Sequence, residues 1–184
     1  MSTQDFDPNN AQNLIEVRQS NRHHMIEKQF AVKAVEHAQT YWNLLEKVSP
    51  RALKLTKLDD EIYEHTMSTF PEFSEDEHVK LLKLDEDWLK SETGKKRWRE
   101  FCQVYEKKVK DYNFGSLIRT DARQEYGETN TIFVTRIQFY AIEIARNRLG
   151  LNDGAHEIAK ADAEKERLKK EQEKARAAKK NATP

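Results

Sequence analysis

The 184-residue sequence predicts an all-α protein, a compact and irregular or orthogonal bundle of about five to six helices with a charged C-terminal tail. Three observations support this prediction. Apolar residues recur every three or four positions through residues 25–112, capping residues and prolines divide that stretch into long and short pieces, and residues 129–149 are apolar nearly all round. A helix that is apolar on every side is typically surrounded by the others. We therefore expect residues 129–149 to form the centre of the bundle.

The first helix is predicted for about residues 25–47, where Ser49-Pro50 ends it. Its apolar stripe consists of Ile26, Phe30, Ala34, Ala38, Trp42 and Leu45. A second helix is expected to open at Thr56-Lys57-Leu58-Asp59, which has the form of a capping box, and to stop at Pro71. The inward positions of this helix are Leu58, Ile62, Thr66 and Phe70.

Three further helix starts follow along the chain. Ser74 begins a short helix that runs to about residue 83, Asp85 caps one turn, and Ser91 begins a long helix. The apolar stripe of the long helix consists of Trp98, Phe101, Cys102, Tyr105, Val109 and Tyr112. The alternation of long and short helices favours irregular packing over an up-and-down bundle.

The central helix is predicted for residues 129–149, with Gly150 placed to cap its C-terminus. Its first turn has a second interpretation. Thr131–Thr135 is rich in β-branched residues, so it could instead form a short strand that leads into the helix.

The two ends of the chain differ from residues 25–154, which we expect to form a single domain. Residues 1–24 are predicted to be a flexible lead, and the tail at 155–184 is predicted to be a frayed helix or disordered. The tail carries nine Lys and Arg against six Asp and Glu, a balance of +3. The only apolar group in the lead before Met25 could be a short partner-binding helix or an extension of the first helix: Leu14, Ile15 and Val17.

Composition limits the class of protein. The chain has 35% charged and 37% hydrophobic residues, a formal net charge of zero, and a mean hydropathy of −0.95. No strong field draws it to nucleic acid or to a membrane, so we expect neither as a direct partner. The single cysteine, Cys102, fits a reducing compartment, and the N-terminus lacks the pattern of a signal peptide. A monomer in the cytoplasm, or also in the nucleus, is expected.

The sequence offers little for an enzyme. Asp85-Glu86-Asp87 has the D-x-D form with which glycosyltransferases hold a metal ion, but acidic residues at a helix start are favoured by the helix dipole alone. No glycine-rich phosphate loop follows a strand, and the histidines have no metal-binding or catalytic spacing. We therefore expect no catalytic residue, no cofactor and no metal. The basic-aromatic run Lys95–Arg99 could contact RNA, although helical spacing places Trp98 in the core.

The segment Asp111–Gly127 is the strongest candidate for a functional loop, because it leads directly into the most apolar helix. Gly115 and Gly127 bracket three charged residues, Arg119, Asp121 and Arg123. These side chains could contact a partner or could merely fasten the loop.

Four runs of this sequence, 27–36, 55–64, 111–127 and 129–153, together resemble the eukaryotic polysaccharide-biosynthesis-domain-containing protein family, over about residues 26–154. The resemblance implies a small, mainly helical, non-enzymatic chaperone dedicated to newly made translation elongation factor 1-alpha. It also implies recruitment at the ribosome through the nascent-polypeptide-associated complex, by a helical segment near the N-terminus. The alternative is a ribosome- or RNA-binding module without a dedicated client.

A chaperone for a GTP-binding domain needs a surface whose affinity falls once nucleotide orders the client. We expect the client at an acidic cluster and at the candidate loop. The predicted client-binding residues are Asp59, Asp60, Glu61, Glu64, Tyr112, Asn113, Phe114, Arg119, Thr120, Asp121, Arg123 and Tyr126.

Overall fold

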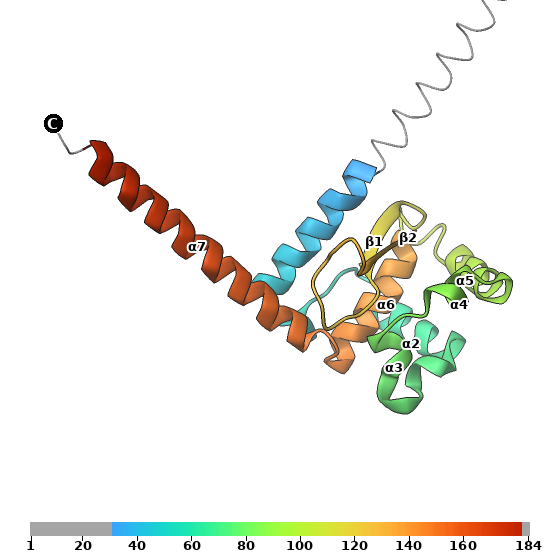
Figure 1. The fold of residues 1–184 in the computed structure, drawn as a ribbon. Coiled ribbons are helices and arrows are strands. Elements are labelled where there is room, and N and C mark those ends of the chain that lie inside the picture. The colour runs from blue at the N-terminus through green and yellow to red at the C-terminus, as the bar shows by residue number, and fades with distance from the viewer. Residues whose placement is uncertain (1–30, 182–184) are drawn as a thin grey trace, which may run out of the picture.

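The computed structural model describes residues 31–181, in which helices predominate and a small β-hairpin packs against α6 (Arg136–Leu149) (Figure 1). Residues 31–47 are helical and are called the N-terminal helix below. The α-helices that follow are α2 (Asp59–Thr69), α3 (Val79–Leu82), α4 (Glu86–Lys90), α5 (Glu92–Val104), α6 (Arg136–Leu149) and α7 (Asp153–Asn181). Short 3-10 turns are η1 (Pro50–Ala52), η2 (Pro71–Ser74) and η3 (Asp76–His78), and the strands are β1 (Gly115–Arg119) and β2 (Thr131–Thr135).

The prediction of an all-α fold was wrong, because β1 and β2 form a two-stranded antiparallel sheet. Gly115 pairs with Thr135, Leu117 with Phe133, and Arg119 with Thr131. The strand interpretation of Thr131–Thr135 is therefore the right one, and the central helix begins at Arg136 rather than 129. β-branched residues fit a pleated, half-buried surface, and Ile118 and Val134 turn inward on that surface.

The caps predicted at Asp85, Ser91 and Gly150 are confirmed, and a further one at Thr135 was not predicted. The capping box predicted at Thr56–Asp59 is not formed, since Leu58 is the N-cap of α2 and no side chain caps that helix. Asp85 accepts a hydrogen bond from the Trp88 N–H at the start of α4, and Ser91 accepts one from the Gly94 N–H at the start of α5. Thr135 and Gln138 form a reciprocal capping box that begins α6 immediately after β2. Gly150 ends α6 with φ +76°, in the left-handed region that favours glycine.

Two predicted helices are shorter in the structure. The helix from Ser91 ends at Val104 rather than Tyr112, and residues 105–113 form turns. The carbonyls of Tyr112 and Phe114 accept hydrogen bonds from the N–H groups of Ile137 and Arg136, so the chain folds back onto the start of α6. The helix predicted from Ser74 begins only at Val79, because the preceding turn η3, Asp76–His78, has positive φ at all three residues.

The core lies between α6 and the elements around it. Tyr41 and Phe139 make an edge contact at 5.0 Å, which joins the N-terminal helix to α6. Phe70 and Trp98 stack at 4.2 Å, which joins α2 to α5. The central position predicted for the apolar helix is thus retained by α6.

Helix α7 docks at its base and then projects away from the other elements (Figure 1). Ala155 and Ala159 are buried, and His156 Nδ1 lies within hydrogen-bond distance of the Leu45 carbonyl in the N-terminal helix. The sequence-based domain boundary at 154 therefore falls inside α7. Beyond Ala163 the described side chains of the helix are exposed and carry ion pairs one turn apart, such as Lys170 with Glu166 at 2.7 Å.

Truncation separates the docked base of α7 from its exposed arm. A chain that ends at Gly154 loses the buried methyl groups of Ala155 and Ala159, so its free energy of unfolding is expected to fall by about 2 kcal/mol. A chain that ends at Ala163 keeps both contacts and should unfold like the full chain. Urea unfolding of the three proteins measures the difference, and equal stability of all three would show that the base does not dock.

None of the helices within residues 31–181 combines the length and the apolar composition needed to cross a membrane.

Candidate functional site

The loop between β1 and β2 is held in one conformation by Asn130. The Asn130 Oδ1 atom accepts hydrogen bonds from the Thr120 hydroxyl at 2.7 Å and the Asp121 N–H at 2.8 Å. Its Nδ2 atom donates to the carbonyls of Asp121 and Glu125, at 3.1 and 2.9 Å. One buried amide therefore closes the loop at both ends.

Asp121 is buried and fastens the outer part of the same loop. It accepts hydrogen bonds from the Arg123 N–H at 3.0 Å and from the Arg123 Nε and Nη2 atoms at 2.9 and 2.7 Å. These hydrogen bonds, led by that of the Arg123 side chain, lower the pKa of Asp121 to about 2. The Arg123 side chain itself is 60% exposed. Of the two, Asp121 is structural and Arg123 is available to a partner.

Asp121→Ala is expected to lower the free energy of unfolding by about 1 to 3 kcal/mol, because the Arg123 N–H loses its partner in a partly buried loop. Arg123→Gln is the matched variant, since it removes the exposed charge and leaves the buried carboxylate its backbone partner. It should lower the free energy of unfolding by about 1 kcal/mol, less than Asp121→Ala, because the buried carboxylate loses its side-chain partner but keeps the Arg123 N–H. Thermal melts of both variants make the comparison, and equal losses would show that Asp121 does not fasten the loop.

A buried charge network lies behind the loop. Arg119 at the end of β1 and Glu143 and Arg146 in α6 have fully buried side chains. The Glu143 carboxylate lies 3.3 Å from Arg119 Nη2 and 2.8 Å from Arg146 Nη1, and it also accepts a hydrogen bond from the Tyr41 hydroxyl at 2.6 Å. The network therefore connects the sheet, α6 and the N-terminal helix.

Backbone carbonyls and one amide satisfy most of the remaining donors of the two arginines. Arg146 donates to the carbonyls of Leu81, Arg119 and Thr120, and Arg119 donates to the Asn152 Oδ1 atom at 2.7 Å. Burial alone would raise the pKa of Glu143, but the two guanidinium groups lower it to about 2. The carboxylate therefore stays ionised, as a buried counter-charge to two arginines.

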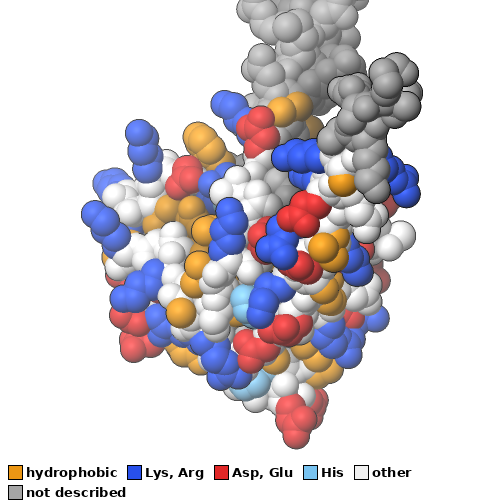
Figure 2. All heavy atoms as spheres, turned by 90° about the vertical axis from the view of Figure 1, so that its left-hand side faces the viewer, with side chains coloured by type: hydrophobic (Ala, Val, Ile, Leu, Met, Phe, Trp, Pro, Cys, Tyr) orange, Lys and Arg blue, Asp and Glu red, His pale blue; other side chains and the backbone are white. Residues whose placement is uncertain are grey.

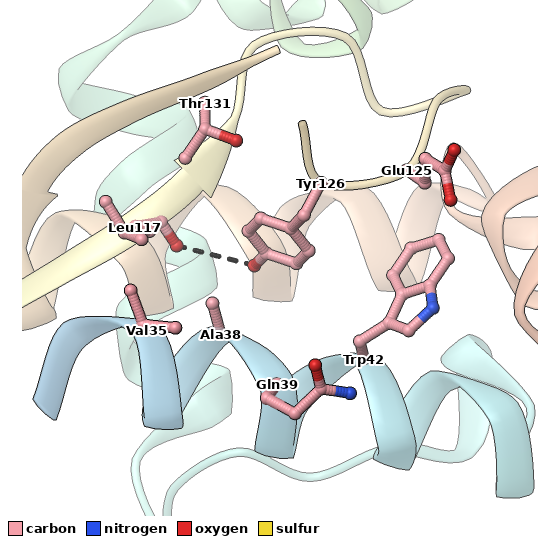
Figure 3. A pocket seen from close by; sticks show the side chains of 8 residues that line it. All are labelled: Val35, Ala38, Gln39, Trp42, Leu117, Glu125, Tyr126 and Thr131. Carbon is pink, nitrogen blue, oxygen red and sulfur yellow. Dashed lines mark hydrogen bonds between the residues drawn. The ribbon is translucent and has the colours of Figure 1, made fainter. Parts of the chain in front are cut away.

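A groove lies between the N-terminal helix, β1 and the loop (Figure 3). It has a volume of about 270 Å³. In Figure 3, Trp42 and Gln39 come from the helix, and the Tyr126 ring points from the loop toward Leu117. The Leu117 carbonyl accepts a hydrogen bond from the Tyr126 hydroxyl at 3.4 Å. The residues that line it, here called the loop groove, are Val35, Ala38, Gln39, Trp42, Leu117, Glu125, Tyr126 and Thr131.

Two aromatic rings separate the loop groove from the buried network. The Trp42 and Tyr126 rings meet edge to face at 6.0 Å. The Arg119 Cζ atom lies 5.5 Å from the centre of the Trp42 ring and 5.7 Å from that of Tyr126. Cation–π attraction of this kind fixes the orientation of both rings. The groove is thus a preformed, mainly apolar surface with polar groups at its edge, as in sites that bind side chains of a partner.

The surroundings of the groove expose apolar side chains of the N-terminal helix and the hairpin. Val35 is 57% exposed, Phe133 is 62% exposed, and Phe114 is half exposed. Figure 2 shows the face that lies to the left in Figure 1, where positive and negative side chains are interspersed and hydrophobic atoms are visible between them. The face has no single sign of charge, which favours a protein partner over a polyanion.

The acidic residues predicted as client contacts lie elsewhere. Asp59 is buried and accepts hydrogen bonds from the N–H groups of Leu55 and Thr56, so it is structural. Asp60 pairs with Arg148, Glu61 pairs with Lys108, and Glu64 is exposed. Asp60 lines a separate hollow with Arg148, so the structure does not bring the acidic cluster into the loop groove.

The predicted residues of the candidate loop divide into two groups. Arg119, Thr120 and Asp121 are held inside by the contacts described above, whereas Asn113, Phe114 and Arg123 are exposed. Tyr112 packs against the core, and Tyr126 lines the loop groove. The predicted recruitment residues Leu14, Ile15 and Val17 lie outside the described residues.

The other candidates from the sequence have structural roles. Asp85 caps α4, Trp98 is buried, and Arg97 donates to Glu72 at 2.6 and 3.0 Å, so the basic-aromatic run does not offer a stacked platform. Burial raises the pKa of Cys102, whose sulfur lies 3.8 Å from the Thr135 hydroxyl. Residues 31–181 contain no group of His, Cys, Asp and Glu side chains that could hold a metal ion.

A half-buried histidine makes the fold sensitive to acid. Burial, with a smaller effect of Arg136, lowers the pKa of His37 from 6.5 to about 4. Between these two pH values the unfolded chain takes up a proton that the folded chain refuses, so stability falls as the pH falls. Above pH 6.5 the group contributes nothing.

We expect a loss of about 1 to 3 kcal/mol between pH 7 and pH 4.5, after allowance for the partial exposure of the His37 ring. Asp121 and Glu143 remain ionised at both pH values. His37→Gln should remove most of the loss. The remainder belongs to His65, whose pKa burial also lowers, and to Glu143, whose carboxylate the unfolded chain begins to protonate near pH 4.5. Urea unfolding at both pH values tests this, and an equal loss in His37→Gln would exclude His37 as the cause.

The sequence did not identify most of the groove. Trp42 and Ala38 were recognised only as members of a core stripe, and Asn130, Glu143 and Arg146 were not singled out. The available signal was a charged pair, Glu143 and Arg146, on the mainly apolar face of the helix that the sequence places at the centre. Charges at core positions require partners from another element, and the structure supplies one in Arg119 of β1.

The chain is similar to known proteins over most of its length. Residues 26–157 match the family model described as PBDC1 protein. The chain is 59% identical over 128 residues to the protein PBDC1 homolog of Saccharomyces cerevisiae, covering 70% of this chain and 86% of that one. It is 53% identical over 148 residues to the homolog of Schizosaccharomyces pombe, covering 80% and 93%. To protein PBDC1 of Homo sapiens it is 45% identical over 142 residues, covering 77% and 58%.

The fold is also similar to a solved structure. A solution NMR structure of protein yst0336 from Saccharomyces cerevisiae superposes with a TM-score of 0.67 at 56% sequence identity, over 72% of this chain and 90% of that chain. The names of these relatives contain no enzymatic term.

Proposed function

Because this chain belongs to the PBDC1 protein family, as the resemblance in its sequence predicted, we propose that it is a dedicated chaperone for newly made translation elongation factor 1-alpha. In this proposal it binds the GTP-binding domain of the client and releases it as that domain folds and binds GTP. The protein itself binds no nucleotide, cofactor or metal and catalyses no reaction. It acts in the cytoplasm, or also in the nucleus.

The observation that carries the proposal is the preformed loop groove. Its walls are fixed by Asn130 and by the buried network of Arg119, Glu143 and Arg146, so the surface needs little ordering when it binds. Apolar walls with a polar edge can hold a segment of an unfinished domain and release it once the client buries that segment itself. Differential affinity for the two states of the client drives this cycle.

Recruitment is the second part of the proposal. The apolar group Leu14, Ile15 and Val17 binds the nascent-polypeptide-associated complex at the ribosome, which raises the local concentration of newly made client. The protein acts as a monomer.

A ribosome- or RNA-binding module is the second candidate, supported by the exposed basic residues of α5 and by the positive balance of the tail. A binder of this kind would lose affinity steeply with salt, because phosphate contacts release counterions.

A capture experiment with purified protein tests the chaperone proposal. The GTP-binding domain of elongation factor 1-alpha is translated in vitro and captured on the immobilised full chain, with and without a non-hydrolysable GTP analogue. We expect capture without nucleotide and a decrease of roughly tenfold with it, equivalent to about 1.4 kcal/mol of differential affinity. Equal capture in both conditions would contradict release by folding, and capture of ribosomal RNA alone would favour the second candidate.

A further inference from the structure

The two edges of the β-hairpin differ in how their backbone groups are satisfied. The hydrogen bonds from Thr120 N–H to the Asn130 carbonyl and from Arg136 N–H to the Phe114 carbonyl fix the register. In an antiparallel pair the hydrogen-bonded positions alternate. Ile132 and Val134 therefore direct their backbone groups toward β1, and Thr131, Phe133 and Thr135 direct theirs away from it.

Side chains cover part of the outer edge of β1, where Gly115, Leu117 and Arg119 direct their backbone groups away from β2. The Leu117 carbonyl accepts a hydrogen bond from the Tyr126 hydroxyl, and the Arg119 carbonyl accepts one from Arg146 Nη1 at 2.8 Å. On β2, the Thr135 N–H donates to Gln138 Oε1 at 2.8 Å. Within residues 31–181, the outward N–H and C=O groups of Thr131 and Phe133 have no partner among the hydrogen bonds of the structure. An open strand edge is a template for another strand.

A groove of about 420 Å³ runs beside this open edge. Leu89 and Ile132 give it apolar surface, and Gln138 lies at its α6 end. Its charged residues are Glu86, Lys90 and Lys95. Lys90 pairs with Glu86, whereas Lys95 forms no ion pair with any residue in the range 31–181, so the groove has an excess of one positive charge.

We propose that the β2 edge binds an extended segment of a partner protein, which adds a third strand beside Thr131–Thr135 and alternates apolar with acidic residues. The apolar side chains of that strand pack against Leu89 and Ile132, and its acidic side chains lie near Lys95. Main-chain hydrogen bonds supply affinity, and the alternate side chains supply specificity.

A second copy of this chain is the less suitable occupant. Pairing of two β2 edges would bring Lys90 and Lys95 of one copy toward the same residues of the other, and like charges oppose such an approach. An acidic segment is complementary instead. The proposed function enters this inference only through the identity of the partner, which would be the client. An unfinished GTP-binding domain exposes strand segments that pair within its own sheet once the domain has folded.

The probe is a short capped peptide that alternates valine with glutamate, added to the full chain and followed by backbone amide NMR. We expect the Thr131 and Phe133 amide signals to shift and to gain protection from exchange. The same peptide with lysine in place of glutamate should bind more weakly, and the peptide with alternate backbone nitrogens methylated should not bind. No shift at Thr131 and Phe133, or shifts only elsewhere, would overturn the proposal.

Two variants separate the backbone from the side chain at the centre of the edge. Phe133→Pro removes the outward N–H without removing a hydrogen bond to β1, as proline at an edge position permits. Phe133→Ala keeps that N–H and removes only the ring. We expect Phe133→Pro to bind the glutamate peptide roughly fivefold more weakly than Phe133→Ala. Equal binding would contradict strand addition, and the methylated peptide keeps the test valid if Phe133→Pro does not fold.

The same NMR experiment distinguishes two other possible occupants of the β2 edge, a second copy of this chain and its own residues 1–24. Shifts of the two amides on dilution without peptide would assign the edge to a second copy, and loss of their protection on removal of residues 1–24 would assign it to the chain's own lead. Either result overturns the proposal. Peptide binding at the edge without capture of elongation factor 1-alpha would leave the strand proposal standing and contradict the proposed function.

Discussion

Replacement of Glu143 by glutamine is expected to lower the free energy of unfolding by about 3 to 5 kcal/mol, the usual cost of breaking a buried ion pair by removal of one partner. The carboxylate is the counter-charge to Arg119 and Arg146, and all three side chains are fully buried. Glutamine has nearly the same shape, so the loss reflects charge rather than a cavity. Because a domain of this size has a total stability of about 5 to 15 kcal/mol, the variant should be only marginally folded.

Glu157→Gln is the control, since this exposed glutamate of α7 contributes only surface pairing and its loss should cost about 0.5 kcal/mol or less. Urea unfolding followed by circular dichroism compares the two variants with the parent chain. If Glu143→Gln unfolded at the same urea concentration as Glu157→Gln, the network would not be what holds the sheet to α6.

Val35→Glu is expected to have the largest effect on client capture. Val35 is 57% exposed and lines the loop groove beside Leu117 and Trp42. A carboxylate there would have to be desolvated by any apolar side chain that entered the groove, so capture should fall by roughly tenfold or more. The stability of the free protein should change by about 0.5 kcal/mol or less, because the side chain is already exposed.

The matched control is Val79→Glu, which introduces the same charge at a valine that is 45% exposed in α3 and does not line the loop groove. Both proteins are compared with the parent chain in the capture of the in vitro translated GTP-binding domain, with melting temperatures measured in parallel. Normal capture by Val35→Glu, or equal loss in both variants, would remove the loop groove from the account.

Local signals in the sequence predicted two helix starts and one helix end correctly, whereas the starts expected at Thr56, Ser74 and residue 129 lie elsewhere. Asp85 and Ser91 cap the helices that they were expected to cap, and Gly150 ends α6 as its position before a new polar segment indicated. Such signals depend on residues only a few positions apart, so one sequence is enough to recognise them.

The hairpin was missed because its cause is not local. Thr131–Thr135 suits a strand, but a strand needs a partner, and Gly115–Arg119 lies 12 or more residues earlier across a loop that Asn130 closes. The apolar run into α6 also has the spacing of a helix, so periodicity alone assigned both elements to one helix.

The candidate site was predicted in part. The predicted loop contributes Tyr126 to the groove. Asp121 fastens the loop, which is one of the two roles that the sequence left open for it. The acidic cluster of α2 was predicted as a client contact only because it is charged. In the structure, Asp59 instead accepts hydrogen bonds from the N–H groups of Leu55 and Thr56. The groove wall formed by the N-terminal helix depends on packing that no local pattern encodes.

In the proposed function, the protein serves one client while that client is being synthesised. The most direct test is capture of the full chain from translating cells, with its associated ribosomes, followed by sequencing of the bound messages. We expect strong enrichment of the message for elongation factor 1-alpha, beginning after its GTP-binding domain emerges, and loss of that enrichment in Val35→Glu but not in Val79→Glu. A broad spread over many messages, unchanged by Val35→Glu, would contradict the proposed function.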